Sequence, residues 1–513
     1  MSHPLERQGS LVDAVSIAEL AQLVGGVAHT VHPDVDVEVR PVFTAVQRPP
    51  VPGGVCVVLP GTPRREAIAA AEAACAGGAG AVLLEGTAPV PGVPTVTVAS
   101  VWAALWKAAA WTAGRYAPAS AHGAVVLVMG GRGLSTALRV CQRMFDEESH
   151  TLVAADTQLP ADLALPMTLT QVADQGPQIA LYEAPGRQVA TAQAAAALTL
   201  PDVLVVLPDS DLLPRAANSG SVRDQVLAIT REMRPDQVVV LCTDDLTLRE
   251  LAGRIRGPQV VTVSTIDSGA SVHVADFHHI LSAKATITWA GHTATATLPV
   301  AGSSAGLSAV AGFAGFLAAK GLTTPDAALT VDRDGFKDLI GRLYYANPCE
   351  VGRMWRGNLP GRGLLVDDTG TCALPDLLAA TEALPLHAGR HRELCAIVGE
   401  LDVGPGADPL DVHALAGAAL AAAGVRRLAV VTGPDAHMTT GAAQTQANLR
   451  ALLSAATDTG VQHAELLSAT APAALDRFLD TLPTGCAVLL KGLGLNSLRP
   501  RLIAHFTARA TEL

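Results

Sequence analysis

Short apolar runs alternate with amphipathic segments along most of this 513-residue chain, and the first part predicts a small α/β domain. The hydrophobic periodicity predicts helices over 16–24, 64–76 and 101–116, an alternating segment at 35–39, and strands over 55–59, 81–84 and 95–98. The sequence Ala-Pro-Ala-Ser at 117–120 has the composition of a linker. We therefore predict a first domain over residues 1–118.

The alternation resumes after residue 120 and then changes character. It predicts strands over 125–129, 178–182, 203–207 and 237–242 and helices over 222–233 and 246–255, which is typical of a doubly wound, mostly parallel sheet. Residues 272–277, 285–289 and 293–298 alternate with a period of two. The Gly291-His292 pair predicts an antiparallel hairpin between the last two of them, before a helix over 306–320. We predict a central domain over residues 119–344.

A third α/β unit follows, over residues 345–513. The pattern predicts buried strands over 364–366, 394–398, 427–431, 463–467 and 486–490, with helices over 411–423 and 446–455. This arrangement is typical of a Rossmann-like sheet. At about 150 residues per domain, the chain length is consistent with three domains.

Charge narrows the classes of partner. The formal net charge is −11 and the sequence has no basic block, so a nucleic-acid partner is not expected. We expect small molecules or other proteins as partners instead.

The cysteines and the N-terminus indicate a cytoplasmic protein. Eight cysteines are scattered singly, without the close pairs of a metal site, and we expect them to be reduced thiols. The first residues lack the basic and apolar regions of a signal peptide. The weakly polar run over 301–319 is rich in small residues, which favours a tightly packed helix over a membrane span.

A glycine-rich turn, Gly130-Gly131-Arg132-Gly133, separates the apolar strand at 125–129 from a helical pattern that begins at Leu134. This strand, loop and helix layout is nearly that of a phosphate-binding loop, G-x-x-x-x-G-K-[ST]. Leu134 stands where the lysine belongs. Ser135 and Thr136 could supply a hydroxyl to magnesium or cap the helix, and the loop amides could still accept a phosphate or sulfate ion.

Several motifs occur in the order of a known family. They are the loop itself, residues 52–61 and 79–85, Gly352-Arg353-Met354, Asp367-Asp368, residues 398–401 with His413, and residues 489–492. Together they resemble the Mur ligase family, and its MurF branch most of all, over nearly the whole chain. The resemblance implies a three-domain α/β architecture with a substrate domain for a UDP-linked precursor, a central ATP-binding domain and a C-terminal domain.

The family implies ATP-dependent amide ligation. ATP phosphorylates a substrate carboxylate, and an amine then displaces the phosphate. This chemistry requires cations around the phosphates, which the family supplies with a loop lysine and with magnesium held by a hydroxyl, an acidic residue and a carbamylated lysine.

In the central domain the sequence departs from this pattern. Leu134 replaces the loop lysine, and Thr230 falls where the carbamylated lysine should be. Residues 302–308 replace the family's G-x-H-N-x-x-N, and residues 242–245 replace its N-x-D-D. Glu183 matches the glutamate that binds magnesium in the family, or is a solvated carboxylate at a strand end. Ser135 and Glu183 are therefore the candidate metal ligands.

In the C-terminal domain the resemblance retains four candidates for cofactor binding: Arg353, Asp367, Asp368 and Lys491. Arg353 would lie near the nucleotide or would pair with one of the two aspartates. Lys491 would contact a ligand or would only be the last residue of a strand. The tyrosine and asparagines that follow the acidic pair in the family are absent.

Two other polar groups have simpler explanations than chemistry. His278, His279 and His292 lack further metal ligands in the predicted hairpin region. Asp408, Asp411 and His413 form a polar cluster at a predicted helix start, where a cap is the simpler explanation.

Two functions follow from these observations. The first is a pseudoenzyme that has lost ATP chemistry and binds a cell-wall precursor, a small peptide or an active Mur-like ligase. The alternative is a divergent ATP-dependent amide ligase that uses Arg132, Glu183 and Ser135 with Mg-ATP. The number of lost contacts favours the first, because each such contact contributes a factor of ~10² to 10³ in rate.

Overall fold

A computed structural model of the chain describes most of its residues. They are 12–31, 37–46, 48–60, 62–115, 124–131, 133–145, 151–154, 161–175, 179–183, 189–208, 222–280, 282–298, 300, 302–328, 330–346, 354–359, 363–370, 372–389, 392–403, 408–432, 442–468, 472–492, 495 and 498–511. These residues fall into two compact units. The first contains the elements up to α3 together with β9 and most of α5, and the second contains most of the rest.

The first unit is built on a five-stranded sheet in the order β2-β7-β6-β5-β4. Its elements are β1 (Val15–Ser16), α1 (Ile17–Val24), β2 (Val27–His29), β3 (Glu38–Val39), β4 (Phe43–Ala45), β5 (Val55–Val57), α2 (Arg64–Ala76), β6 (Ala81–Glu85), β7 (Thr95–Val98) and α3 (Val101–Arg115). Ser16 and Glu19 form a capping box that fixes the start of α1. The helix ends at Gly25, whose φ of 74° favours glycine.

A helix from later in the chain, α5 (Ala161–Gln175), belongs to the same unit. The Phe43 amide donates to Thr170 Oγ1 at 3.0 Å, and Gln171 Nε2 donates to the Phe43 carbonyl at 2.7 Å. Arg40 forms an ion pair with Asp174. These bonds use the edge strand β4, whose backbone groups would otherwise lack partners.

The second unit contains the central sheet, whose strands β16-β15-β14-β13-β12-β11-β8 lie in that order. They are β8 (Ala124–Met129), β11 (Val203–Val206), β12 (Val238–Cys242), β13 (Gln259–Ser264), β14 (Val272–Ile280), β15 (Ser282–Trp289) and β16 (His292–Leu298). The neighbouring strands from β8 to β14 are parallel, and β15 is antiparallel to both β14 and β16. The two remaining strands of this part of the chain are β9 (Thr151–Ala154) and β10 (Ile179–Glu183).

Helices α4 and α9 meet at very short range beside this sheet. The helices of the region are α4 (Leu134–Phe145), α6 (Val189–Thr199), α7 (Val222–Glu232), α8 (Leu246–Ala252), α9 (Ser303–Ala319), α10 (Pro325–Ala328) and α11 (Arg333–Tyr345). A side chain at Gly312 would collide with the Ala137 carbonyl, so the small residues of α9 permit the approach. In the part of the chain that the structure describes, no helix is long and apolar enough to span a membrane.

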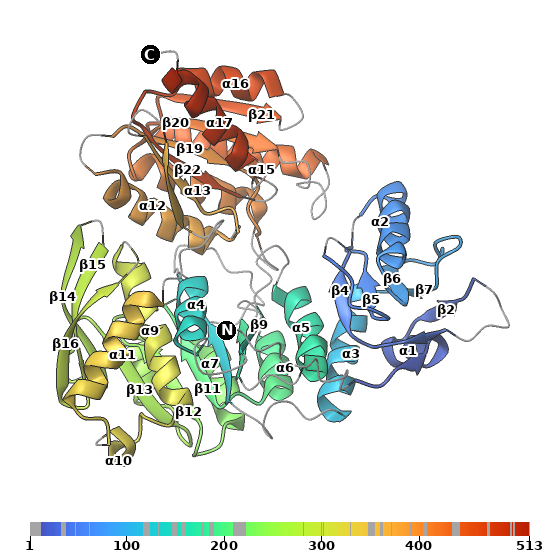
Figure 1. Cartoon of the computed structure of the whole chain (residues 1–513), viewed down its shortest axis with the longest axis horizontal. Helices are drawn as coiled ribbons and strands as arrows, with labels where there is room; N and C mark the ends of the chain where they lie inside the picture. The colour runs from blue at the N-terminus through green and yellow to red at the C-terminus, as the bar shows by residue number, and fades with distance from the viewer. Residues whose placement is uncertain are drawn as a thin grey trace. The chain divides into compact units, whose positions relative to one another are not determined.

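The C-terminal sheet has the order β17-β18-β22-β19-β20-β21, and only β17 is antiparallel to its neighbour. Its strands are β17 (Trp355–Leu359), β18 (Gly363–Asp367), β19 (Leu394–Val398), β20 (Val425–Thr432), β21 (His463–Ser468) and β22 (Ala487–Lys491). The helices are α12 (Leu374–Ala388), α13 (Pro409–Ala422), α15 (Ala442–Thr459), α16 (Pro472–Thr481) and α17 (Leu498–Thr511) (Figure 1).

The helices cover both faces of this sheet. One buried cluster joins α12, α13 and α15 to one face, and a second joins α16 and α17 to the other. The chain therefore leaves β22 toward the face opposite to the one it takes after β18 and β19. Such a reversal between adjacent parallel strands is where open α/β sheets bind ligands.

These sheets confirm the predicted fold class, a multi-domain α/β chain with mostly parallel sheets. They also confirm the antiparallel hairpin around Gly291. The segment predicted to alternate from residue 35 is described as a strand only at Glu38–Val39, and α9 begins at Ser303 instead of residue 306. The boundaries near 118 and 344 stay predictions.

Candidate functional site

The glycine-rich turn connects β8 to α4 as predicted. Gly130 has a φ of 130°, and a Cβ there would lie 2.5 Å from the Leu207 carbonyl oxygen. Gly133 has a φ of 74°, and a side chain there would collide with Ser308. Only glycine fits both positions, so these residues are explained by packing against β11 and α9 without a ligand.

Leu134 is a core residue and not an outward replacement for a lysine. It begins α4 and is only 7% exposed. The Gly131 amide donates to the Pro208 carbonyl at 3.2 Å, so one amide of the expected anion site already has a partner. Ser135 and Thr136 are half-buried in the first turn of α4. Arg132 lies outside the described residues.

Thr230, at the position of the carbamylated lysine, is buried in α7, and its hydroxyl donates to the Leu227 carbonyl at 3.4 Å. Asp244 and Asp245 are occupied by local bonds: Asp244 accepts from Ser264 and from Thr265, while Asp245 caps α8. Neither carboxylate is directed to a nucleotide by these contacts.

An acidic side chain lies at the start of α9. Ser304 Oγ donates to Glu382 Oε2 at 2.7 Å, and Ser308 Oγ donates to the Ser304 carbonyl at 2.8 Å. Ser308 also abuts Gly133 of the loop. The Glu382 carboxylate therefore lies at the N-terminal, positive end of the α9 dipole.

Glu183 is the last residue of β10, but its side chain lies outside the described part, as do all atoms of Arg353. Their predicted roles are therefore not tested. Among the described residues, no group of three histidines, cysteines, aspartates or glutamates could hold a metal ion.

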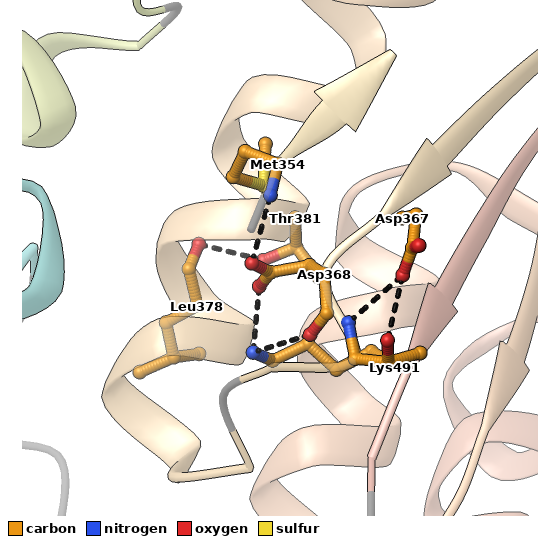
Figure 2. Close-up of polar contacts among 7 residues, drawn as sticks. Met354, Asp367, Asp368, Leu378, Thr381 and Lys491 are labelled. Carbon is orange, nitrogen blue, oxygen red and sulfur yellow. Dashed lines mark hydrogen bonds and ion pairs between the residues drawn. The ribbon is translucent and has the colours of Figure 1, made fainter. Parts of the chain in front are cut away.

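The C-terminal sheet brings the other predicted residues together. Lys491 Nζ lies 2.6 Å from Asp368 Oδ2, and both side chains are buried (Figure 2). The same ammonium group lies 3.5 Å from the Asp368 carbonyl oxygen, and Asp368 Oδ1 accepts from the Met354 amide at 3.1 Å. Lys491 is the last residue of β22 and Asp368 follows the last residue of β18. Because these two strands are parallel neighbours, both residues lie at the carboxyl end of the sheet.

Asp367 forms a second ion pair, which sequence reasoning missed. Arg499 Nη1 donates to Asp367 Oδ2 at 2.6 Å, and the Thr369 amide and hydroxyl donate to Oδ1 at 3.1 and 2.8 Å. Asp367 is fully buried, whereas the Arg499 side chain is 24% exposed. Arg499 comes from α17, on the face opposite to α12.

Glu400 was also missed as a functional candidate. It is buried beyond the end of β19, where Thr445 Oγ1 donates to it at 3.0 Å and Asn448 Nδ2 donates at 3.3 Å. His413 is buried nearby: its Nε2 accepts from the Leu401 amide at 3.1 Å. Burial lowers the pKa of His413, although its bond to the Pro409 carbonyl opposes this change. Asp408 caps α13, which confirms the capping interpretation.

Close backbone packing between the residues after β22 and β19 holds the carboxyl ends of these strands together. Gly492 has a φ of 126°, and a Cβ there would lie 2.6 Å from the Gly399 nitrogen. The Gly399 amide donates to the Lys491 carbonyl at 2.8 Å. The ends of β18, β22 and β19 thus carry buried acidic and basic groups at the reversal point of the sheet.

Comparison with known proteins adds the family context. No protein-family model and no curated protein sequence matches this chain. MurF from Acinetobacter baumannii is similar in structure, with a TM-score of 0.61 and 18% identity over 98% of this chain and 100% of that one. This chain has the Mur ligase fold.

Two further structures agree. MurF ligase from Thermotoga maritima, solved in complex with ADP, has a TM-score of 0.56 and 18% identity over 92% of this chain and 98% of that one. A murein peptide ligase from Psychrobacter arcticus has a TM-score of 0.51 and 12% identity over 78% of this chain and 80% of that one. The Mur ligase fold therefore extends over nearly the whole chain.

The fold implies Mg-ATP, and the described residues of the central loop do not fit it. Leu134 is buried and uncharged, the Gly131 amide has a partner, and a carboxylate lies at the start of α9. The Glu382 carboxylate at the start of α9 would repel an incoming polyphosphate. We derive no catalytic step through ATP at this loop.

Proposed function

We propose that this chain is a MurF-like homologue of the Mur ligases that has lost ATP chemistry. In this proposal it binds a cell-wall precursor or a related small peptide, or associates with an active Mur-like ligase. The observation that carries the proposal is the burial of Leu134 at the first position of α4. A phosphoryl-transfer loop needs a cation at that point, and a core leucine cannot provide it.

Two other observations support the loss of ATP chemistry. Thr230 is a buried, locally bonded residue where a carbamylated lysine would be needed. The Asp244 carboxylate already accepts hydrogen bonds from Ser264 and Thr265. The Mur ligase fold extends over nearly the whole chain, which supports a role in binding.

Calorimetric titration with Mg-ATP tests the proposal directly. We expect no saturable heat at concentrations where MurF from Thermotoga maritima, used as the positive control, is saturated. We also expect no phosphate release when amino acids and dipeptides are added. Magnesium-dependent binding of ATP together with amine-dependent phosphate release would refute the proposal.

The binding role requires its own measurement. Titration with a UDP-linked muramyl peptide, and separately with UDP alone, is expected to give a saturable signal for the peptide-bearing ligand. Co-purification with a Mur ligase from the same cell would support the partner role. If neither the precursor nor a Mur ligase binds, the binding role is wrong even if ATP chemistry is absent.

The alternative is a divergent ATP-dependent amide ligase. The observation that favours it is the preserved strand, loop and helix geometry, with Ser135 and Thr136 in the first turn of α4. In this alternative Ser135 and Glu183 hold magnesium and Arg132 replaces the lysine. The Mg-ATP titration distinguishes the two functions.

A further inference from the structure

Strand β16 ends the central sheet, and its geometry determines which backbone groups are available for pairing. The β15–β16 hairpin turns at Ala290-Gly291, with φ values of 49° and 79° and with Trp289 paired to His292. Two consecutive positive φ values define a type I′ turn, which closes on a hydrogen-bonded pair. His292, Ala294, Ala296 and Leu298 therefore bond to β15.

The intervening residues face the open edge. Because hydrogen-bonded and non-hydrogen-bonded pairs alternate along an antiparallel ladder, Thr293, Thr295 and Thr297 direct their N–H and C=O groups away from β15. Thr293 and Thr295 are exposed, and Thr297 is half-buried. A row of regularly spaced donors and acceptors thus lies along β16, at one end of the central sheet (Figure 1).

Among the described residues, no further strand pairs with this edge. β16 contains no charged residue and no proline, and its register with β15 is continuous from Ala283 to Trp289. The adjacent β14–β15 pair, by contrast, is interrupted between Ala275 and His278. Helix α11 contacts the hairpin through Phe336, which lies 5.7 Å from the Trp289 ring and 6.0 Å from the His292 ring. The helix also packs against β16 itself. Thr293 and Thr295 nevertheless stay exposed, and an exposed strand without charges can accept another strand.

We propose that β16 pairs antiparallel with β16 of a second copy of this chain, with Thr295 on the two-fold axis. Outward-facing residues must then meet outward-facing residues, which places Thr295 against Thr295 and Thr293 against Thr297. Each such pair exchanges backbone hydrogen bonds in both directions. The two central sheets join into one continuous sheet, and the symmetry closes the assembly as a dimer.

The sequence of β16 is complementary to itself in this register. Thr–Thr pairs are favourable across strands, and Ala294 meets Ala296 on the opposite face. No like charges oppose one another in the strand, so an identical copy is a better occupant than a charged peptide. Each copy carries a formal net charge of −11, so dimerisation should strengthen as salt concentration rises.

Sedimentation equilibrium with two charge variants tests the interface. Thr295→Glu places two carboxylates opposite each other on the axis, and we expect the dimer to weaken at least tenfold. Thr288→Glu adds the same charge to the neighbouring strand, away from the axis, and we expect less than a threefold change. A monomeric wild-type protein at several hundred micromolar, or equal effects of both variants with unchanged melting temperatures, would overturn the proposal.

Register-specific cross-linking tests the position of the axis. A hydrogen-bonded antiparallel pair has its Cα atoms about 5.5 Å apart, which is within the range of a disulfide. Thr295→Cys should therefore form a dimer on a non-reducing gel, whereas Thr293→Cys alone should not. An equimolar mixture of Thr293→Cys and Thr297→Cys should cross-link. Equal cross-linking of every variant and of the wild-type protein, which has eight cysteines, would contradict this register.

Discussion

Lys491 Nζ and Asp368 Oδ2 lie 2.6 Å apart, and the lysine side chain is completely buried between β22 and the residues after β18. Removing one partner leaves a buried charge without compensation. We expect Lys491→Met to lower the free energy of unfolding by about 3–5 kcal/mol, measured by urea denaturation with a probe in the C-terminal sheet.

The double variant Asp368→Asn/Lys491→Met is the matched control, because it removes both charges. It should recover a large part of the loss seen in Lys491→Met. Arg499→Met should cost less than Lys491→Met, since Asp367 keeps its two hydrogen bonds from Thr369 and the Arg499 side chain is itself partly exposed. A double variant as unstable as Lys491→Met would show that the ion pair is not the cause.

Replacing Leu134 by lysine should not create an ATPase. The side chain is 7% exposed, so the ammonium group must be desolvated or must leave the core. We expect Leu134→Lys to lower the free energy of unfolding by about 1–3 kcal/mol, without magnesium-dependent ATP hydrolysis. Leu134→Met conserves volume and should cost less than about 1.5 kcal/mol. ATP hydrolysis by Leu134→Lys would disprove this expectation.

Alanine variants of Gly492 and Gly460 distinguish the cost of a steric clash from the cost of an unfavourable backbone conformation. Both have a φ near 130°, but a Cβ at Gly492 meets the Gly399 backbone while one at Gly460 meets nothing within 4 Å. Both variants to alanine pay the cost of an unfavourable conformation, about 1–2 kcal/mol. Gly492→Ala should melt at a clearly lower temperature than Gly460→Ala, and equal melting temperatures would contradict the close approach.

His387 should make stability depend on pH in the acidic range. Burial first, and then the charge of Arg356, lower the pKa of His387 to about 4. The unfolded chain has a pKa near 6.5 at this residue, so between those two values it binds a proton that the folded chain does not. Stability from this residue is fully present above about pH 6.5 and falls as the pH drops toward 4.

The loss should reach about 3 kcal/mol over that window. It can be measured as the difference between urea denaturation of the wild-type protein and of His387→Gln at several pH values. The His413 contribution is common to both proteins and cancels in the difference. Parallel pH profiles would indicate that His387 does not titrate as stated.

Local patterns predicted strands such as β8, β12 and β22 well because each is a short apolar run that is buried on both faces. They failed for helices whose sequences contain internal breakers. Helix α5 includes Pro166 and α12 includes Pro385 in its interior, so neither had a clean helical period. In α5 tertiary contacts with β4 compensate, and these contacts join residues far apart in the sequence.

The site was partly predictable for a similar reason. The order of Asp367, Asp368 and Lys491 along the chain indicated one domain, and the parallel pairing of β18 with β22 brought Asp368 and Lys491 together. Arg499 gave no signal, because a lone arginine in a C-terminal amphipathic helix usually faces solvent. Only the crossing of α17 to the other face of the sheet places it against Asp367.

The burial of Leu134 also limits the paths that evolution can take from this sequence. The neighbours of a core residue fit its volume, so replacing Leu134 by lysine loses packing before it gains a charge contact. Gly133, which a side chain would drive into Ser308, is similarly committed to the contact with α9. Substitutions at both residues are therefore opposed by packing, whichever ligand or partner the chain binds.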